Sequence, residues 1–227
     1  MDVIILSGGL GTRLRDVVKN IPKTMALIDN KPFLEYTLKK LKQYNVKNVI
    51  LAVGYKKEYI EEYFGNKYIG MNIIYSEESE PLGTGGAIKK ALEKTKEKNI
   101  IVINGDIYQN VNLEELMKEH IQSNKNVTLT LKEMSNFDRF GSVRFNRYKT
   151  ITEFKEKEFT TKGYINVGVY AMKRNIFDNI LLNDKFSIEK DYFNKYADKN
   201  IFNAYLYNGE FIDIGIPSDY EYLKQKI

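Results

Sequence analysis

The chain contains no cysteine and a single histidine, His120, among its 227 residues. Without cysteine it has neither a disulfide framework nor a thiolate metal site, and one histidine cannot form a histidine cluster. The same scarcity argues against a Ser-His-Asp triad, and His120 is most simply interpreted as a residue of a helix surface or of a helix's last turn. Any metal must therefore have oxygen ligands, which favours magnesium or manganese.

The N-terminal apolar run is short. Residues 3–6 are hydrophobic and follow Asp2, which fits neither a signal peptide nor a membrane span. We therefore expect a cytoplasmic protein without a membrane partner. A chain of 227 residues, 43% of them hydrophobic, is long and apolar enough for one domain with a substantial core.

Positive charge exceeds negative charge only modestly, with a net charge of +5 and an isoelectric point near 9.0. Such an excess suits anionic substrates and equally an ordinary soluble surface. Lysines alternate with acidic residues in residues 89–98, which is typical of a solvated helix face. The 17 tyrosines are scattered through expected strands and helices, where packing explains most of them. Nucleic-acid binding is therefore the weaker interpretation.

The hydrophobic pattern predicts an α/β fold with a Rossmann-like, mixed but mostly parallel sheet flanked by helices. In the first half, short apolar runs alternate with amphipathic segments of helical spacing. The expected strands there are residues 3–6, 48–53, 72–75 and 100–103, and the expected helices are residues 33–41, 59–64, 88–92 and 113–123.

The second half is richer in β-strand signals. A helix is expected over residues 187–196, with Ser187 as its N-cap, and another after Pro217. The expected strands are residues 127–131, 142–145, 151–154, 164–172 and 201–207. We expect a single domain over residues 1–227, in which residues 126–227 extend the sheet of residues 1–125 and provide a wall for a second substrate.

A glycine-rich segment follows the first expected strand. The glycines in residues 8–11 let the backbone approach a phosphate closely, and Thr12 and Arg13 add hydrogen-bond donors. Leu14 stands where the dinucleotide fingerprint has its third glycine, and the spacing also fails the Walker A pattern, so a nicotinamide cofactor is disfavoured. Taken alone, the segment is also compatible with a tight turn that binds nothing.

Two aspartates lie beside glycine after strand-like runs. Asp106 ends the Asn-Gly-Asp sequence of residues 104–106, and Asp213 begins the Asp-Ile-Gly sequence of residues 213–215. Open α/β sheets place ligand sites at the carboxyl ends of their strands, although each aspartate alone is equally explained as an N-cap or turn residue. Together, two carboxylates from distant segments can hold one hard cation while phosphate oxygens and water complete its octahedron.

Residues 82–87 are rich in glycine and open a helix. Free amides and a small-residue surface coincide there, which suits packing against a base or a sugar, although an ordinary loop-to-helix junction has the same composition. Lys23 follows Pro22, and Lys157 follows Glu156. Lysines of this kind are usually solvated surface residues, and the local pattern gives them no further meaning.

Taken in order, these motifs resemble those of the sugar-1-phosphate nucleotidylyltransferases. Each motif is weak, but their ordered conjunction over nearly the whole chain is specific, and the closest likeness is to the short bacterial D-glycero-α-D-manno-heptose-1-phosphate guanylyltransferases. Thr24 and Glu158 stand where many relatives have proline. The resemblance is carried by Gly8, Gly9, Leu10, Gly11, Thr12, Arg13, Pro22, Lys23, residues 82–87, Asn104, Gly105, Asp106, Arg139, Phe140, Gly141, Phe154, Glu156, Lys157, Asn166, Gly168, Asp213, Ile214 and Gly215.

The resemblance implies an enzyme that joins a nucleoside triphosphate, here GTP, to a sugar 1-phosphate, here D-glycero-α-D-manno-heptose 1-phosphate, with release of pyrophosphate. It gives catalytic roles to Arg13, at the triphosphate and the departing pyrophosphate, and to Lys23, at the α-phosphate and the incoming phosphate. It implies that Asp106 and Asp213 hold Mg²⁺ or Mn²⁺.

The remaining implied contacts divide between the two substrates. Residues 1–125 would form the nucleotide-binding half and residues 126–227 the sugar-phosphate-binding half. The implied nucleotide-binding residues are Leu6, Gly8, Gly9, Gly11, Thr12, Glu80, Gly83, Thr84, Gly85 and Gly86, with Glu80 at the amino edge of guanine. The implied sugar-phosphate-binding residues are Asn104, Gly141, Glu156, Lys157 and Asn166.

Alternative functions remain open at this stage. The same reaction with UTP or CTP, or with mannose or glucose 1-phosphate, would use the same motifs. A non-catalytic nucleotide-sugar-binding regulatory protein would keep the fold, although the presence of Arg13, Lys23, Asp106 and Asp213 argues against it. We expect a product used in capsule or surface polysaccharide biosynthesis, and exposed strand edges in the second half are compatible with a homodimer.

Overall fold

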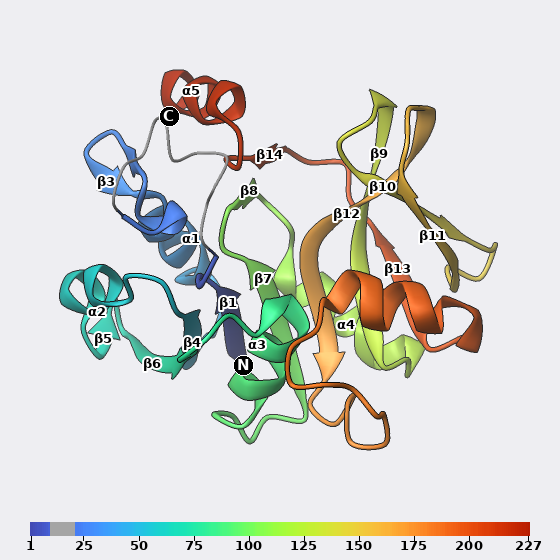
Figure 1. The fold of residues 1–227 in the computed structure, drawn as a ribbon, viewed down its shortest axis with the longest axis horizontal. Coiled ribbons are helices and arrows are strands. Elements are labelled where there is room, and N and C mark those ends of the chain that lie inside the picture. The colour runs from blue at the N-terminus through green and yellow to red at the C-terminus, as the bar shows by residue number, and fades with distance from the viewer. Residues whose placement is uncertain (10–20) are drawn as a thin grey trace.

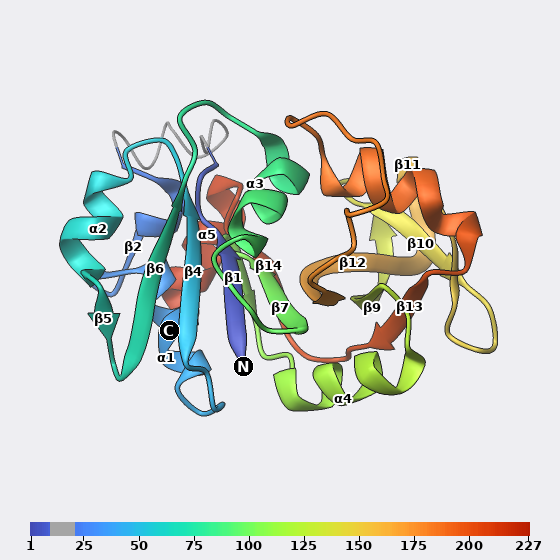
Figure 2. The same ribbon diagram turned by 90° about the horizontal axis from the view of Figure 1, so that it is seen from below.

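The computed structural model describes residues 1–9 and 21–227, and only the backbone of Glu156 (Figure 1). The centre of the fold is a set of parallel strands made of buried aliphatic residues, which lie side by side in Figure 2. Its strands, in spatial order, are β7 (Asn99–Asn104), β1 (Asp2–Leu6), β4 (Asn48–Val53) and β6 (Met71–Glu77). Such near-continuous apolar runs are typical of parallel strands covered on both faces.

Alternate residues of these strands belong to two different cores. Val3 and Ile5 of β1 pack in a cluster with Leu34 and Leu38 of α1 (Phe33–Leu41). Ile4 belongs to a second cluster, which is covered by α3 (Gly83–Leu92). The period-two alternation of a strand therefore separates the two faces of the sheet, and helices cover both. The first face is also covered by α2 (Glu58–Phe64) and α4 (Leu113–Ser123).

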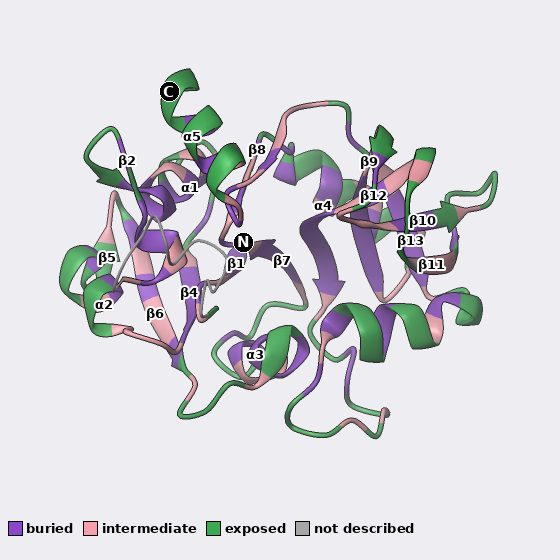
Figure 3. Cartoon of the chain, turned by 45° about the horizontal axis from the view of Figure 1, so that its top comes forward, coloured by how far each residue is buried: buried purple, intermediate pink, exposed green. Residues whose placement is uncertain are grey.

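The sheet continues into the second half of the chain through one long strand, β12 (Thr160–Lys173). β12 pairs antiparallel with β7 over residues 169–173 and with β9 (Val127–Phe137) along most of its length. The described residues thereby form one ten-stranded sheet across both halves. Its remaining strands are β5 (Lys67–Tyr68), β10 (Gly141–Phe145), β11 (Ile151–Lys157) and β13 (Phe202–Leu206). Figure 3 shows that buried residues concentrate on the central strands.

A bulge interrupts β12 where it passes the end of β7. The register with β9 shifts between Asn166 and Tyr170, and Gly168 inside this interval has a φ of 77°. A Cβ atom on Gly168 would lie 2.5 Å from Nδ2 of Asn104. Glycine is therefore required for both the backbone conformation and the close approach, and the bulge sets the direction of Asn166.

A small two-stranded sheet brings the end of the chain back to the carboxyl end of β7. β8 (Ile107–Gln109) pairs antiparallel with β14 (Phe211–Asp213), and α5 (Pro217–Lys226) follows. Ile214, Tyr220 and Leu223 pack in a third core cluster beside Phe33 of α1. The short elements β2 (Leu27–Ile28), β3 (Lys31–Pro32) and η2, a 3₁₀ turn (Lys23–Met25), border this region.

The predicted fold class is confirmed, and most expected elements form near their expected bounds. The segment expected as a helix over residues 187–196 begins at its predicted cap, because Oγ of Ser187 accepts a hydrogen bond from the amide of Lys190. It continues as a π-helix (η3, Ile188–Asn194), which is followed by a 3₁₀ turn (η4, Ala197–Lys199). Within the part of the chain that the structure describes, no helix is long and apolar enough to span a membrane.

Candidate active site

A cavity of about 450 Å³ opens at the carboxyl ends of β1 and β7, beside the start of α3. Its position agrees with the ligand sites of open α/β sheets. It is lined by Leu6, Ser7, Gly8, Gly9, Lys23, Thr24, Ala52, Glu78, Pro81, Gly83, Thr84, Ala87, Asn104 and Asp106. The structure therefore gathers the predicted nucleotide residues Leu6, Gly8, Gly9, Gly83 and Thr84 around one space. The predicted residues Gly11, Thr12 and Arg13 lie outside the described residues.

Glycine at position 8 is required by close packing at the end of β1. A Cβ there would lie 3.0 Å from Oε1 of Glu78 and 3.3 Å from the backbone nitrogen of Gly54. Both distances are shorter than ordinary van der Waals contact, so a side chain at this position would require Glu78 or the backbone at Gly54 to shift.

The glycines at the start of α3 have different functions. Gly83 has a φ of 73°, and a Cβ on it would lie 2.6 Å from the carbonyl oxygen of Phe186. A Cβ on Gly85 would overlap the ring of Phe186, and one on Gly86 would overlap the carbonyl of Asp184. Gly83 lines the cavity, whereas Gly85 and Gly86 do not. The last two allow residues 184–186 to pack against α3.

Besides Asp106, the cavity is lined by the carboxylate of Glu78, one residue beyond β6, whereas Glu80 is exposed and is not among the lining residues. Oε2 of Glu78 accepts a hydrogen bond of 2.9 Å from the amide of Leu82. Burial raises the pKa of the Glu78 carboxyl above its usual value, and this hydrogen bond partly opposes the shift. Sequence reasoning missed Glu78, although its place after a central strand was the available signal.

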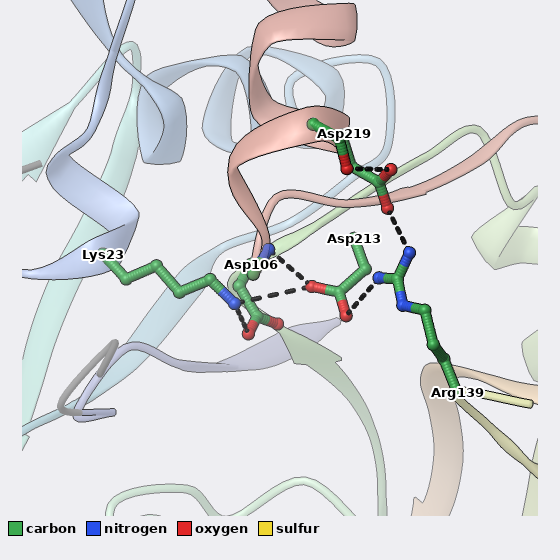
Figure 4. A network of polar contacts seen from close by, with 7 residues as sticks. Lys23, Asp106, Arg139, Asp213 and Asp219 are labelled. Carbon is green, nitrogen blue, oxygen red and sulfur yellow. Dashed lines mark hydrogen bonds and ion pairs between the residues drawn. The ribbon is translucent and has the colours of Figure 1, made fainter. Parts of the chain in front are cut away.

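Asp106 and Asp213 converge on the ammonium of Lys23 (Figure 4). Nζ of Lys23 lies 2.6 Å from Oδ2 of Asp106 and 3.4 Å from Oδ1 of Asp213. The pairing of β8 with β14 brings the two aspartates together, and the amide of Ile214 donates to the carbonyl of Asp106 at 3.1 Å. The structure thus brings together Lys23, Asp106 and Asp213, three residues that the sequence motifs singled out.

Glycine is also needed beside this cluster. A Cβ on Gly215 would lie 2.6 Å from both Nζ of Lys23 and Oδ1 of Asp213. The amide of Gly215 donates to that same Oδ1 at 2.7 Å, which fixes the Asp213 carboxylate. The Asp-Ile-Gly sequence therefore leaves room for a cation and orients one of its ligands.

Arg139 approaches Asp213 from the side opposite Lys23, as Figure 4 shows. Its Nη1 donates to Oδ2 of Asp219 at 3.0 Å, and its Nη2 lies 3.8 Å from Oδ2 of Asp213. Arg139 comes from the segment between β9 and β10, and Asp219 from α5. The guanidinium therefore links the segment between β9 and β10 to the aspartate cluster.

The donor set fits a divalent cation with oxygen ligands. Two carboxylates from distant segments already hold one positive charge, the Lys23 ammonium, between them. Mg²⁺ is usually bound by one or two carboxylates together with substrate phosphates and water. The described residues contain no group of three or more acidic, histidine or cysteine side chains that could hold a metal ion, so the remaining ligands would come from the substrate and solvent.

A second cavity, of about 150 Å³, lies between β10, β11, the β12 bulge and the π-helix. It is lined by Phe140, Gly141, Val143, Phe154, Lys155, Lys157, Asn166, Glu189, Lys190 and Asn194. The predicted sugar-phosphate residues Gly141, Lys157 and Asn166 are thus brought together. The side chain of Glu156 lies outside the described part. Asn104 lines the first cavity, and its buried Oδ1 has no hydrogen-bond partner among the described residues.

The two cavities are joined by packed and hydrogen-bonded residues. Asn104, in the first cavity, approaches Gly168 closely, two residues from Asn166 in the second. Oγ1 of Thr84 accepts a 3.0 Å hydrogen bond from the amide of Ile188, which begins the π-helix. This arrangement suits two substrates that must meet in a fixed orientation.

The family described as nucleotidyl transferase matches residues 2–227. The chain belongs to this nucleotidyl transferase family. It is 48% identical to a D-glycero-α-D-manno-heptose 1-phosphate guanylyltransferase of Aneurinibacillus thermoaerophilus, over 100% of this chain and 98% of the relative. It is 44% identical to the Campylobacter jejuni protein of the same name, over 97% of each.

A solved structure supports the same membership. The crystal structure of HddC from Yersinia pseudotuberculosis in complex with GMP-PN has a TM-score of 0.87 and 35% sequence identity to this nucleotidyl transferase. The match covers 99% of this chain and 98% of that one.

Proposed function

We propose that this protein transfers the guanylyl group of GTP to D-glycero-α-D-manno-heptose 1-phosphate, which yields the GDP-activated heptose and pyrophosphate. The observation that carries this proposal is the arrangement of two cavities beside the Lys23, Asp106 and Asp213 cluster. It is supported by two relatives, 48% and 44% identical to this chain, that are both named D-glycero-α-D-manno-heptose 1-phosphate guanylyltransferase. We further propose a cytoplasmic reaction whose product serves surface polysaccharide assembly.

The first cavity would hold the nucleotide. Its wall contains Gly8, Gly9 and Gly83, which have no side chain and let a ligand approach the backbone closely, and this suits phosphates and a flat base. Glu78 would accept hydrogen bonds from the N1–H and amino groups of guanine, because a carboxylate has two acceptor oxygens. We also propose that Arg13 contacts the triphosphate, as the sequence motifs imply.

The second cavity would hold the sugar 1-phosphate. Lys155, Lys157 and Lys190 line it and supply positive charge for a phosphate. Val143 and Phe154 supply apolar surface for the C–H face of a sugar. A cavity with both features fits a phosphorylated sugar better than either an apolar ligand or an unmodified sugar.

The reaction needs no general base from the protein. A phosphate monoester has a second pKa of about 6, so the attacking oxygen is already largely ionised at neutral pH. It forms a bond to the α-phosphorus of the nucleotide while the bond from that phosphorus to the bridging oxygen of the leaving pyrophosphate breaks. Catalysis is therefore positioning of two anions and stabilisation of their charge.

Lys23 is placed for that stabilisation. Its ammonium lies at the wall of the nucleotide cavity beside Asp106, where it can contact an α-phosphate oxygen. Asp106 and Asp213 would hold a magnesium ion, which when bound supplies positive charge to phosphate oxygens. Arg139 holds Asp213 from the other side.

The test is pyrophosphate release in the presence of Mg²⁺, with GTP, UTP, CTP, ATP and dTTP crossed against heptose, mannose and glucose 1-phosphates. We expect the highest kcat/KM for GTP with the heptose phosphate. Preference for another pair would keep the mechanism and replace the substrates. If folded protein turns over no pair but is stabilised against heat by nucleotides or nucleotide sugars, a regulatory binding protein is the correct interpretation.

A further inference from the structure

The second cavity contains a carboxylate that the sequence motifs did not single out. Glu189 lies near the start of the π-helix and is exposed to the cavity. The helix is held in place at this end, because the amide of Ile188 donates to Thr84 and the ring of Phe186 packs against Gly85 of α3. π-Helical turns occur frequently at functional sites. Glu189 is therefore presented to the cavity by a fixed segment.

Asn166 uses its hydrogen-bonding groups within the protein. Its Nδ2 donates to Oη of Tyr170 at 2.8 Å and to Oε1 of Glu189 at 3.0 Å, and its Oδ1 accepts from the amide of Gly168 at 3.0 Å. An amide nitrogen has two hydrogens, so both donors are engaged. To donate to a sugar, Asn166 would have to give up one of these bonds.

The same bond orients Glu189. With Oε1 held by Asn166, the carboxylate has its second oxygen, Oε2, available, and within residues 1–9 and 21–227 the structure shows no protein donor to it. Asn166 itself is fixed by the β12 bulge, and Tyr170 behind it is fully buried. The carboxylate thus lies at the wall of the cavity with one oxygen anchored in the protein and the other without a donor among the described residues.

We propose that Glu189 binds hydroxyl groups of the sugar in this cavity and that Asn166 acts as the residue that positions it. This inference rests on the proposed function, because it takes the cavity to be the sugar-phosphate site. A carboxylate is an acceptor with two oxygens, which matches the hydroxyl donors of a polyol. The lysines of the cavity match the phosphate and cannot accept from hydroxyls.

The electrostatic environment supports this assignment. Burial by surrounding protein atoms raises the pKa of the Glu189 carboxyl, while Asn166 and the charge of Lys157 act in the opposite direction. Asp106 raises the same pKa further, and Lys190 lowers it. Hydroxyl donors of a bound sugar would satisfy a carboxylate that the protein alone solvates incompletely.

The experiment is steady-state kinetics of Glu189→Gln with GTP and the heptose 1-phosphate. The amide keeps the shape but replaces one acceptor oxygen with a donor. We expect the KM for the sugar phosphate to rise about tenfold or more, while kcat changes less than about threefold and the KM for GTP stays constant. Glu62→Gln, an exposed carboxylate on α2, is the matched control and should leave all three parameters unchanged.

Inorganic phosphate separates hydroxyl recognition from damage to the cavity. As a competitive inhibitor against the sugar phosphate, it should bind Glu189→Gln as well as the wild type or more tightly, because the variant removes a negative charge. If the variant's affinities for inorganic phosphate and for the sugar phosphate fall by the same factor, the assignment is overturned, because the substitution then damages only the local structure.

A double-mutant cycle tests the positioning role of Asn166. Asn166→Ala should raise the sugar-phosphate KM in the wild-type background and change it less than about twofold in the Glu189→Gln background. Independent, multiplicative losses would overturn the positioning role. An unchanged sugar-phosphate KM in an active Glu189→Gln enzyme would overturn the inference alone, whereas a wild type that turns over no sugar phosphate would overturn the proposed function and the inference with it.

Discussion

The ammonium of Lys23 lies 2.6 Å from Oδ2 of Asp106, and the Lys23 side chain is only 13% exposed. A positive charge of the protein thus lies between Asp106 and Asp213, at the place where the metal is expected. Lys23 and a bound metal ion would compete for the same two carboxylates. This relationship makes the site testable by metal binding as well as by turnover.

Replacement of Lys23 by methionine should separate metal binding from catalysis. Without the ammonium, Asp106 loses its ion pair and Asp213 keeps only that with Arg139, so we expect the Kd of the free protein for Mn²⁺ to fall by about threefold or more. Turnover should fall about 100-fold or more, because the contact with phosphate is lost. Calorimetric titration with Mn²⁺ measures the first effect, and Lys31→Met, an exposed lysine of β3, is the control. Mn²⁺ affinity that stays equal or weakens would refute the competition.

Asp106→Asn should abolish turnover without unfolding the protein. The amide has nearly the same shape but lacks the charge that holds Lys23 or a cation, so we expect a loss of about 100-fold or more in kcat. Circular dichroism and Tm verify the fold. Asp184→Asn removes an exposed carboxylate whose side chain is 94% accessible and should have no effect. Near-normal turnover of Asp106→Asn in Mg²⁺ would show that Asp106 is not a metal ligand.

The preference for guanine over other bases can show whether Glu78 or Glu80 contacts the base. Inosine triphosphate lacks the amino group of guanine, so wild-type enzyme should prefer GTP if a carboxylate accepts from that group. Glu78→Gln should lower kcat/KM for GTP about tenfold or more and remove most of the preference over inosine triphosphate. Glu80→Gln, a neighbouring exposed carboxylate, serves as the matched control. If instead the Glu80 variant loses the preference, the assignment from the sequence is correct and the one from the cavity is wrong.

His120 should make the protein less stable in mild acid. Burial, with a smaller contribution from the charge of Lys173, lowers the pKa of His120 from 6.5 to about 4. The unfolded chain therefore binds the proton more readily than the folded one between these values, so stability is complete above pH 6.5 and is lost as the pH falls toward 4. From pH 7 to 5 the wild type should lose about 2 kcal/mol more than His120→Gln in urea unfolding. Parallel pH dependence of the two proteins would contradict this role.

The sequence predicted the long elements well because their periodicity is strong. The strand at residues 48–53 and the helix at residues 113–123 have the bounds that the pattern indicated. The surface placement of His120 was wrong, because its side chain is only 1% exposed. Leu113, Leu116 and His120 follow one another at helical spacing on the buried face of α4, so the periodic pattern already contained the signal.

The site depended on contacts that a local pattern does not specify. The pairing of β8 with β14 joins two strands of three residues each, too short to show periodicity, and only this pairing places Asp106 beside Asp213. The order of motifs implied that proximity, but none of the motifs included Glu189. Glu189 reaches the cavity because the π-helix carries it and the β12 bulge sets its partner Asn166. Both elements depend on tertiary packing and not on local propensity.

The Asp213 and Asp219 carboxylates lie in the C-terminal part of the described chain, and β14 pairs with β8, which lies near the middle of the sequence. Most of the central sheet can form on the ribosome before these residues emerge, because β1, β4, β6 and β7 all precede residue 105. A nascent chain therefore has the nucleotide cavity before it has the second aspartate. The pair of Asp106 and Asp213 can therefore form only after residue 213 has been synthesised and β14 has paired with β8.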